Sequence, residues 1–259
     1  MTAVLYTGGS GRMGSVIRAG LAGAFDRTVL YVRSDVPEIF PGEEVVKGGL
    51  DDLLLLAEAC RDVDVVIHLA GIADEAPWTD LLKSNIEGTY AVLEAARRAG
   101  VRRVVYASSN HIIGCYPTTE RIGPNDPVRP DTYYGVSKVF GEGLARLYHD
   151  KWGLEVICLR IGSFRPRPED VRQLSTWLSH RDGVELVRRA VLADPLDFQI
   201  VYGVSANARS WWDNDAAADA IGYQPRDDAE DFAIEVENTP EPRLQGGAFT
   251  HPDYQGGLW

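Results

Sequence analysis

The sequence predicts an α/β fold with a doubly wound parallel sheet. Short apolar runs alternate with longer segments of helical period, as repeated βαβ units require. A glycine-rich turn follows the first apolar run directly. The 259 residues, of which 45% are hydrophobic, suffice for one large core without a disulfide or a structural metal. We therefore expect a single domain over residues 1–259.

Each expected strand is a short apolar run, and each expected helix carries its apolar residues on one face. The expected strands cover residues 3–6, 28–32, 65–69, 104–108, 156–161 and 198–202. The expected helices cover residues 13–21, 51–60, 85–98, 133–152 and 183–192. Gly100 follows the third of these helices and is expected to end it. The last third of the chain is less regular, and residues from Thr239 on are rich in Gly and Pro.

The charge and the cysteine content argue against several classes of protein. With 26 Lys and Arg against 38 Asp and Glu, the net charge is −12, which disfavours binding to nucleic acid. Cys60, Cys115 and Cys158 are widely spaced, so we expect neither a metal site nor a disulfide framework. The sequence opens without a signal-peptide pattern, and no apolar run approaches the ~20 residues of a membrane span. We expect a soluble, cytoplasmic protein with no membrane partner.

The glycine turn has the spacing of a dinucleotide-binding loop. Gly8, Gly11 and Gly14 lie between the first strand and the first helix in a GxxGxxG pattern. Such a turn lets the backbone approach a pyrophosphate, and the helix N-terminus then faces the phosphates. The pattern predicts a Rossmann fold that binds NAD or NADP; the alternative is a purely structural turn. The residues expected to contact the cofactor here are Gly8, Ser10, Gly11, Arg12, Met13 and Gly14.

The end of the second strand distinguishes the two cofactors. An acidic residue at this position hydrogen-bonds the ribose 2′-hydroxyl of NAD and repels the 2′-phosphate of NADP. Here the strand is followed by Arg33 and Ser34, and Arg12 lies nearby in the glycine turn. Two guanidinium groups are suited to a phosphate, so we favour NADP over NAD. In the alternative interpretation, Asp35 takes the acidic role one residue later and both arginines are solvated.

Tyr134 and Lys138 are expected to form an acid–base pair. They are four residues apart on a predicted helix, so their side chains share one face. A phenol has a pKa of about 10, which a neighbouring ammonium and a cationic nicotinamide ring would lower. Ser109, just after a predicted strand, is placed to hydrogen-bond the reacting oxygen. Asn85 is expected either in a polar helix kink, holding a water for proton relay, or as a helix cap.

These motifs resemble the short-chain dehydrogenase/reductase superfamily over roughly residues 1–165. Longer motifs resemble the uronate dehydrogenases, of the extended type, over nearly the whole chain. They lie at residues 108–114, 116–117, 119–121, 129–131, 134–142, 160–163, 172–177, 205–207 and 211–214. The resemblance implies that residues 1–160 mainly bind the cofactor and that residues 161–259, a small C-terminal part, mainly bind the substrate. It also implies a homo-oligomer.

That family oxidises the anomeric carbon of a hexuronic acid to a lactone. The resemblance implies that Ser109, Asn110, His111 and Ser163 hydrogen-bond the sugar together with Tyr134, and that Arg172 binds its carboxylate. Arg172 is alternatively a partner of Glu169 or Asp170. Besides the glycine turn, the implied cofactor contacts are Arg33, Ser34, Leu50, Leu69, Ala70, Gly71, Tyr134, Lys138 and Ile161.

Three departures from the family pattern leave the sugar and the cofactor open. The family carries an acid where this chain has Arg33 and Ser34, an Asp-Leu pair near the adenine where this chain has Gly49 and Leu50, and a serine near the substrate where this chain has Ala73. The expected function is therefore oxidation of a hexuronate, with a neutral aldose such as L-arabinose or galactose as the alternative. A sugar-nucleotide epimerase or dehydratase, and a non-catalytic cofactor sensor, are further alternatives.

Overall fold

The computed structural model describes residues 2–194 and 196–257. Within them, seven strands form one sheet in the order β3-β2-β1-β4-β5-β6-β9, and all neighbouring pairs are parallel. The order runs outward from β1 in both directions, so a topological switch point lies between β1 and β4, where this class of fold binds its ligands. The strands are β1 (Ala3–Thr7), β2 (Arg27–Val32), β3 (Glu43–Lys47), β4 (Val65–His68), β5 (Arg103–Ser109), β6 (Glu155–Ile161) and β9 (Phe198–Gly203).

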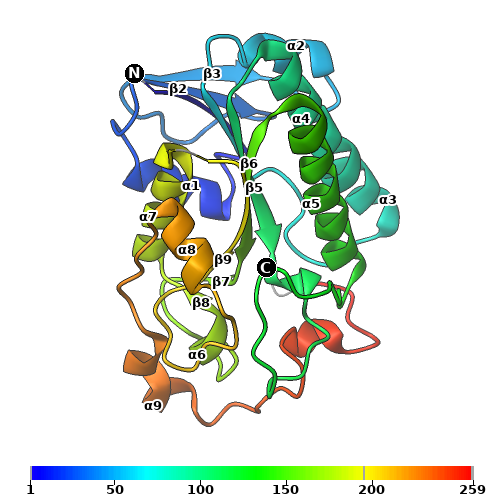
Figure 1. The fold of residues 1–259 in the computed structure, drawn as a ribbon, viewed down its shortest axis with the longest axis vertical. Helices are drawn as coiled ribbons and strands as arrows, with labels where there is room; N and C mark the ends of the chain where they lie inside the picture. The colour runs from blue at the N-terminus through cyan, green and yellow to red at the C-terminus, as the bar shows by residue number, and fades with distance from the viewer. Residues whose placement is uncertain (1, 195, 258–259) are drawn as a thin grey trace.

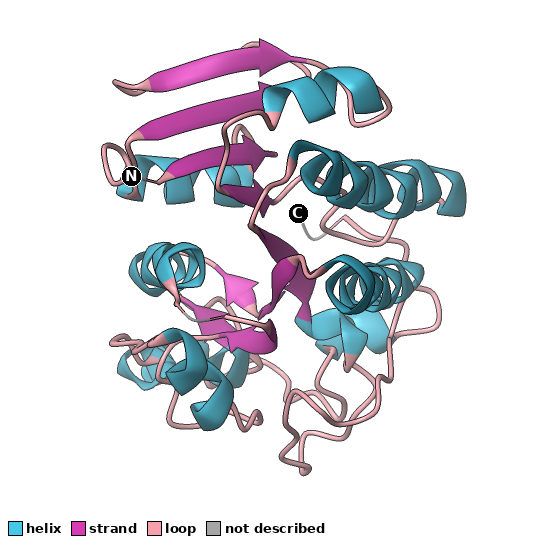
Figure 2. Ribbon diagram, turned by 45° about the horizontal axis from the view of Figure 1, so that its top comes forward, coloured by secondary structure: helices cyan, strands magenta, loops and turns pink. Residues whose placement is uncertain are grey.

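Helices cover both faces of the sheet (Figures 1 and 2). One face packs on α1 (Arg12–Gly20), α7 (His180–Leu192) and α8 (Asp215–Ile221), and the other packs on α2 (Leu53–Ala59), α4 (Gly88–Ala99) and α5 (Tyr133–Trp152). Strand β1 shows why two cores form: Val4 and Tyr6 enter the first, and Leu5 enters the second. The doubly wound α/β prediction is confirmed.

The remaining elements lie beyond the main layers. They are α3 (Trp78–Leu81), the π-helical η1 (Leu82–Glu87), η2 (Asn110–Ile112), β7 (Ser163–Phe164), α6 (Gln173–Thr176), β8 (Trp177–Leu178), η3 (Ala229–Phe232), α9 (Ala233–Val236) and η4 (Gly247–Thr250). In the part of the chain that the structure describes, no helix combines the length and the apolarity needed to cross a bilayer.

One strand of the sheet was not predicted, and one expected helix is wrong. Strand β3 was not expected, because it is an edge strand whose Val45 and Val46 are flanked by charged residues. The helix expected over residues 85–98 is interrupted, since α3, η1 and α4 follow one another and Asn85 lies inside the π-helical segment. This interruption bears directly on the site, because π-helical turns displace side chains from the regular helical face.

Candidate active site

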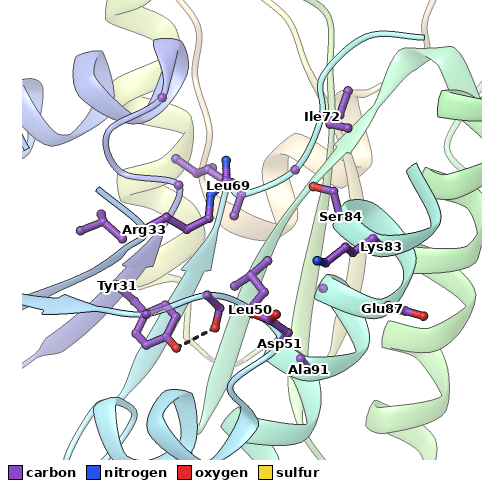
Figure 3. Close-up of a pocket in the computed structure, with 18 of the residues that line it drawn as sticks. Tyr31, Arg33, Leu50, Asp51, Leu69, Ile72, Lys83, Ser84, Glu87 and Ala91 are labelled. Atoms are coloured by element: carbon purple, nitrogen blue, oxygen red, sulfur yellow. Dashed lines mark hydrogen bonds between the residues drawn. The ribbon is translucent and has the colours of Figure 1, made fainter. Parts of the chain in front are cut away.

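A cavity of about 1050 Å³ lies at the carboxyl ends of β1, β2 and β4. Figure 3 shows Arg33 and Leu69 on one side of it and Lys83 and Ser84 of η1 on the other. Tyr31 shapes the floor, donating a hydrogen bond of 2.8 Å from its hydroxyl to the Gly49 carbonyl. The expected cofactor residues that line the cavity are Gly8, Ser10, Gly11, Arg33, Ser34, Leu50, Leu69, Ala70 and Gly71. Those outside its described lining are Arg12, Met13, Gly14, Tyr134, Lys138 and Ile161.

The glycine turn is shaped by contacts that exclude side chains. A Cβ on Gly14 would lie 2.2 Å from the Gly8 carbonyl oxygen, and a Cβ on Gly8 would lie 2.5 Å from the Ala70 nitrogen. Gly8 also has a φ of +74°, which favours glycine. Helix α1 begins after Gly11 with neither a side-chain cap nor an acidic residue in its first turn. Its backbone N–H groups are therefore available to an anion, and the cradle fits the pyrophosphate of a dinucleotide.

The residues that follow β2, which the sequence analysis relates to the adenosine ribose of the cofactor, lie at the rim of the cavity. Arg33 and Ser34 are exposed there and line the cavity. Asp35 is also exposed, but its carboxylate pairs with Lys47 of β3, and it is outside the described lining. Arg33 and Ser34 therefore face the cavity, whereas Asp35 is engaged with Lys47.

Tyr134 and Lys138 lie in the first two turns of α5 and are 5% and 6% exposed. Thr132 caps the helix by accepting a hydrogen bond of 3.0 Å from the Gly135 nitrogen, and Glu75 accepts one of 2.9 Å from the Tyr134 nitrogen. The Lys138 ammonium lies 5.8 Å from the centre of the Tyr134 ring. The sequence-predicted pair is therefore brought together and shielded from bulk water.

Burial controls the ionisation of this pair. It raises the pKa of Tyr134 to about 12, although a hydrogen bond with Ser109 lowers it. Burial also lowers the pKa of Lys138 to about 8. In the protein alone the net shift of the Tyr134 pKa is upward, because desolvation outweighs the hydrogen bond with Ser109.

Asn85 connects three parts of the site. Its Oδ1 accepts a hydrogen bond of 2.8 Å from the Ile72 nitrogen, and its Nδ2 donates to the Ile72 carbonyl at 2.9 Å and to Ser137 Oγ at 3.0 Å. Both N–H donors are therefore used within the protein. The helix-capping alternative is wrong, because Asn85 lies inside η1.

A cluster of polar side chains follows β5 and β6. Ser109 ends β5, Asn110 and His111 form η2, and all three are buried. The hydrogen-bonding surroundings orient the Asn110 amide so that it donates to the Ile161 carbonyl at 2.9 Å and accepts from Arg172 Nη2 at 2.7 Å. The expected sugar-binding residues therefore meet at one place, whereas Ala73 is exposed and makes no polar side-chain contact.

Arg172 is held by neutral groups. Its Nε donates to the Gln245 carbonyl at 2.7 Å, and its Nη1 donates to Ser163 Oγ at 3.3 Å. The alternative partners are engaged elsewhere: Glu169 pairs with Arg165 at 3.5 Å, and Asp170 accepts from the Gln173 nitrogen at 2.9 Å. Among the described residues, Arg172 forms no ion pair, so its charge is available to a ligand carboxylate.

The C-terminal strap, defined as residues 242–257, was missed by the sequence analysis (red in Figure 1). Phe249 stacks on the His111 ring at a centroid distance of 3.7 Å. The Tyr254 hydroxyl donates to Asp74 Oδ1 at 2.5 Å, and the Gly257 nitrogen donates to Asp74 Oδ2 at 2.8 Å. The tail is rich in glycine and has no hydrophobic periodicity. Its aromatic residues are the feature of the sequence that indicates contacts with the rest of the protein.

Comparison with known proteins agrees with this geometry. The model of the NAD dependent epimerase/dehydratase family matches residues 4–181. A uronate dehydrogenase from Agrobacterium fabrum is 44% identical, over 96% of this chain and 97% of its own length. An L-arabinose 1-dehydrogenase (NAD(P)(+)) from Haloferax volcanii is 36% identical, over 88% of this chain and 98% of its own.

A solved structure shares the whole fold. It is a variant of uronate dehydrogenase from Agrobacterium tumefaciens in complex with NAD, and it is 43% identical with a TM-score of 0.92. The match covers 98% of this chain and 99% of that chain. This protein therefore belongs to the NAD dependent epimerase/dehydratase family, in the uronate dehydrogenase-like branch of the short-chain dehydrogenase/reductase superfamily.

Proposed function

We propose that this oxidoreductase oxidises the anomeric carbon of a hexuronate to the corresponding lactone. The carbon loses its hydrogen as hydride and its hydroxyl loses a proton, which leaves the carbonyl of the lactone. A nicotinamide ring bound in the cavity supplies the hydride acceptor. Tyr134 takes the hydroxyl proton, Ser109 holds the same oxygen, and Lys138 adds a positive charge that stabilises the phenolate.

The choice of a uronate as the substrate rests on the positive charge of Arg172. A guanidinium that pairs with no carboxylate of the described chain, and that is held in place by Gln245, Ser163 and Asn110, is suited to a carboxylate ligand. Asn110, His111 and Ser163 lie around the same point and supply the hydrogen bonds that sugar hydroxyls need. A neutral aldose remains the second candidate, because Ala73 offers no polar group and one relative is named for L-arabinose.

The substrate test is a comparison of catalytic efficiencies. Galacturonate, glucuronate, L-arabinose and galactose are compared by cofactor reduction, and we expect the best uronate to exceed both neutral sugars. Arg172→Met should raise the KM for the uronate about 10- to 100-fold, because it removes a charged hydrogen bond, and should affect neutral sugars less, through the lost contacts to Asn110 and Ser163 alone. Arg167→Met, at a 66%-exposed arginine paired with Glu235, is the matched control. Equal efficiency with a neutral aldose would refute the uronate assignment.

NADP is proposed as the preferred cofactor. Arg33 at the cavity rim supports this choice, since a guanidinium binds a 2′-phosphate and the described lining contributed by residues 31–34 contains no acid. Relatives are named for NAD and for NAD(P)(+). The ratio of kcat/KM for NADP and NAD tests the proposal, and Arg33→Asp should shift that ratio toward NAD. A wild-type preference for NAD would contradict it.

The two parts of the chain and Asn85 have separate roles in the proposed reaction. Residues 1–160 mainly hold the cofactor, residues 161–259 mainly hold the sugar, and Asn85 positions Ile72 and Ser137 around the reaction centre. The protein acts in the cytoplasm as a homo-oligomer. Light scattering on the purified protein measures the oligomeric state, and a monomer at micromolar concentration would contradict the last point.

A further inference from the structure

The carboxylate of Asp131 is buried against two glycines. Its side chain is fully buried, and its Oδ1 accepts a hydrogen bond of 3.0 Å from Thr132 Oγ1. A Cβ on Gly114 would lie 1.8 Å from Asp131 Oδ2, and a Cβ on Gly246 would lie 2.1 Å from the same oxygen. The loop after β5 and the C-terminal strap therefore both leave room for this one oxygen.

The same oxygen, Asp131 Oδ2, forms a hydrogen bond with His111. Asp131 Oδ2 lies 2.7 Å from His111 Nδ1. An ionised carboxylate has no hydrogen to donate, so Nδ1 must carry the proton. Burial lowers the pKa of His111, and Arg172 lowers it further, whereas Asp131 and Asp74 raise it. The balance favours a neutral imidazole, in which the other ring nitrogen, Nε2, has a free lone pair and no hydrogen.

The ring is also fixed in place. Phe249 stacks on one face of His111 with an interplanar angle of 23°, and the Tyr134 ring lies 5.9 Å away, centre to centre. Among the described residues, no protein group forms a hydrogen bond with Nε2. A sugar that reacts at Tyr134 therefore has a hydroxyl close to the His111 ring, whose Nε2 is an acceptor of fixed orientation.

We propose that Asp131 is a positioning residue that holds His111 in its Nδ1–H tautomer, so that Nε2 accepts a hydrogen bond from a substrate hydroxyl. The inference rests on the proposed function, because it assumes a polyhydroxylated substrate beside Tyr134. Its consequence is a directional requirement: the substrate must present a donor to His111. The same buried carboxylate does not touch the substrate and acts only through the imidazole.

The direct test is the tautomer itself. Long-range ¹H–¹⁵N spectra of protein labelled with ¹⁵N-histidine distinguish Nδ1–H from Nε2–H rings, and the His111 signals are those lost in His111→Phe. We expect the Nδ1–H tautomer in the wild type. An Nε2–H ring or an imidazolium near neutral pH would overturn the proposal. This measurement needs neither a substrate nor a folded Asp131 variant.

The kinetic test uses Asp131→Asn, which keeps the shape but adds an N–H donor. The amide donates to Nδ1, moves the proton to Nε2 and turns the acceptor into a donor. We expect kcat/KM for the uronate to fall about 10- to 100-fold, mainly through KM, with cofactor affinity unchanged. Asp126→Asn, a surface carboxylate that accepts from the Gly123 nitrogen, is the control and should leave kinetics unaltered.

A double-mutant cycle separates the positioning role from a structural one. In the His111→Phe background, which keeps the stack on Phe249, Asp131→Asn should cost no further activity. An undiminished loss in that background would refute action through His111. If the wild type oxidises no uronate at all, the proposed function fails, whereas the tautomer spectrum still decides the proposal about Asp131.

Discussion

The Lys138 ammonium donates a hydrogen bond of 2.8 Å to the carbonyl oxygen of Ala107, two residues before Ser109 on β5. The lysine of the helix and the serine of the strand are therefore positioned by the same stretch of backbone. This contact also keeps the ammonium 5.8 Å from the Tyr134 ring centre, a range over which its charge stabilises a phenolate.

The pH dependence of activity should depend on Lys138. The wild-type kcat/KM should rise between about pH 6 and pH 10, because the phenolate is the reactive form and burial raises the pKa of Tyr134 to about 12. Lys138 carries its charge mainly below its lowered pKa of about 8, so Lys138→Met should lower kcat/KM there and approach the wild-type profile above that pH. Profiles over this range measure the difference. Lys151→Met, at the exposed end of α5, should leave the profile unchanged; a Lys138→Met profile that matches the wild type also below the Lys138 pKa contradicts the role.

Tyr134→Phe should abolish most turnover. Loss of a general base lowers kcat by about 10²- to 10⁴-fold, whereas cofactor affinity should stay close to that of the wild type. Steady-state kinetics and cofactor titration by fluorescence measure the two effects. Tyr133→Phe is the matched control, because Tyr133 is 62% exposed and its ring lies edge-on to Trp78. Turnover that survives in Tyr134→Phe would exclude the tyrosine as the base.

Gly14→Ala should weaken cofactor binding and lower stability. The new Cβ meets only backbone atoms, namely the Gly8 carbonyl oxygen at 2.2 Å and Gly9 Cα at 2.8 Å, so no side chain can move aside. Gly143→Ala is the opposite case, since a Cβ there meets nothing within 4 Å inside helix α5. It should stabilise the protein by roughly 0.5–1 kcal/mol. Thermal unfolding with and without cofactor compares the pair, and equal behaviour would contradict the steric argument.

Glu142→Ala should be strongly destabilising. Glu142 accepts two hydrogen bonds of 2.9 Å from the buried Arg160 and one of 2.7 Å from Ser108, the neighbour of Ser109. Its removal leaves a buried guanidinium uncompensated, at a cost of about 3–5 kcal/mol in the free energy of unfolding.

Urea unfolding measures that cost, and Asp150→Ala provides the control. Asp150 forms an ion pair with Arg146 in which both side chains are more than half exposed, so its loss should cost less than about 1 kcal/mol. Similar losses in the two variants would show that burial does not determine how much the Glu142–Arg160 ion pair contributes to the free energy of unfolding.

The sequence predicted the parts of the site that are local in the chain. Tyr134 and Lys138 share one helix face, Ser109 follows a strand, and the glycine turn joins two adjacent elements, so periodicity alone places them. Contacts between distant segments had no such signal. The stack of Phe249 on His111 and the bond between Tyr254 and Asp74 depend on how an irregular tail folds back.

Electrostatic outcomes were equally inaccessible from the sequence. Whether Arg172 pairs with Glu169 or Asp170 depends on side-chain directions around α6, and the structure gives both carboxylates other partners. The sign of the Tyr134 pKa shift depends on burial, which a motif does not report. Edge strand β3 was missed because its two valines, Val45 and Val46, are only partly buried and lie between charged residues that dilute its apolar pattern.

The position of the strap in the chain imposes an order of assembly. All seven strands of the sheet precede residues 242–257, and so do the glycine turn, Tyr134 and Arg172. As the chain leaves the ribosome, the dinucleotide cradle can form while the aromatic cover over His111 has yet to be synthesised. The elements that form the dinucleotide cradle are therefore complete before the segment that covers His111 is synthesised.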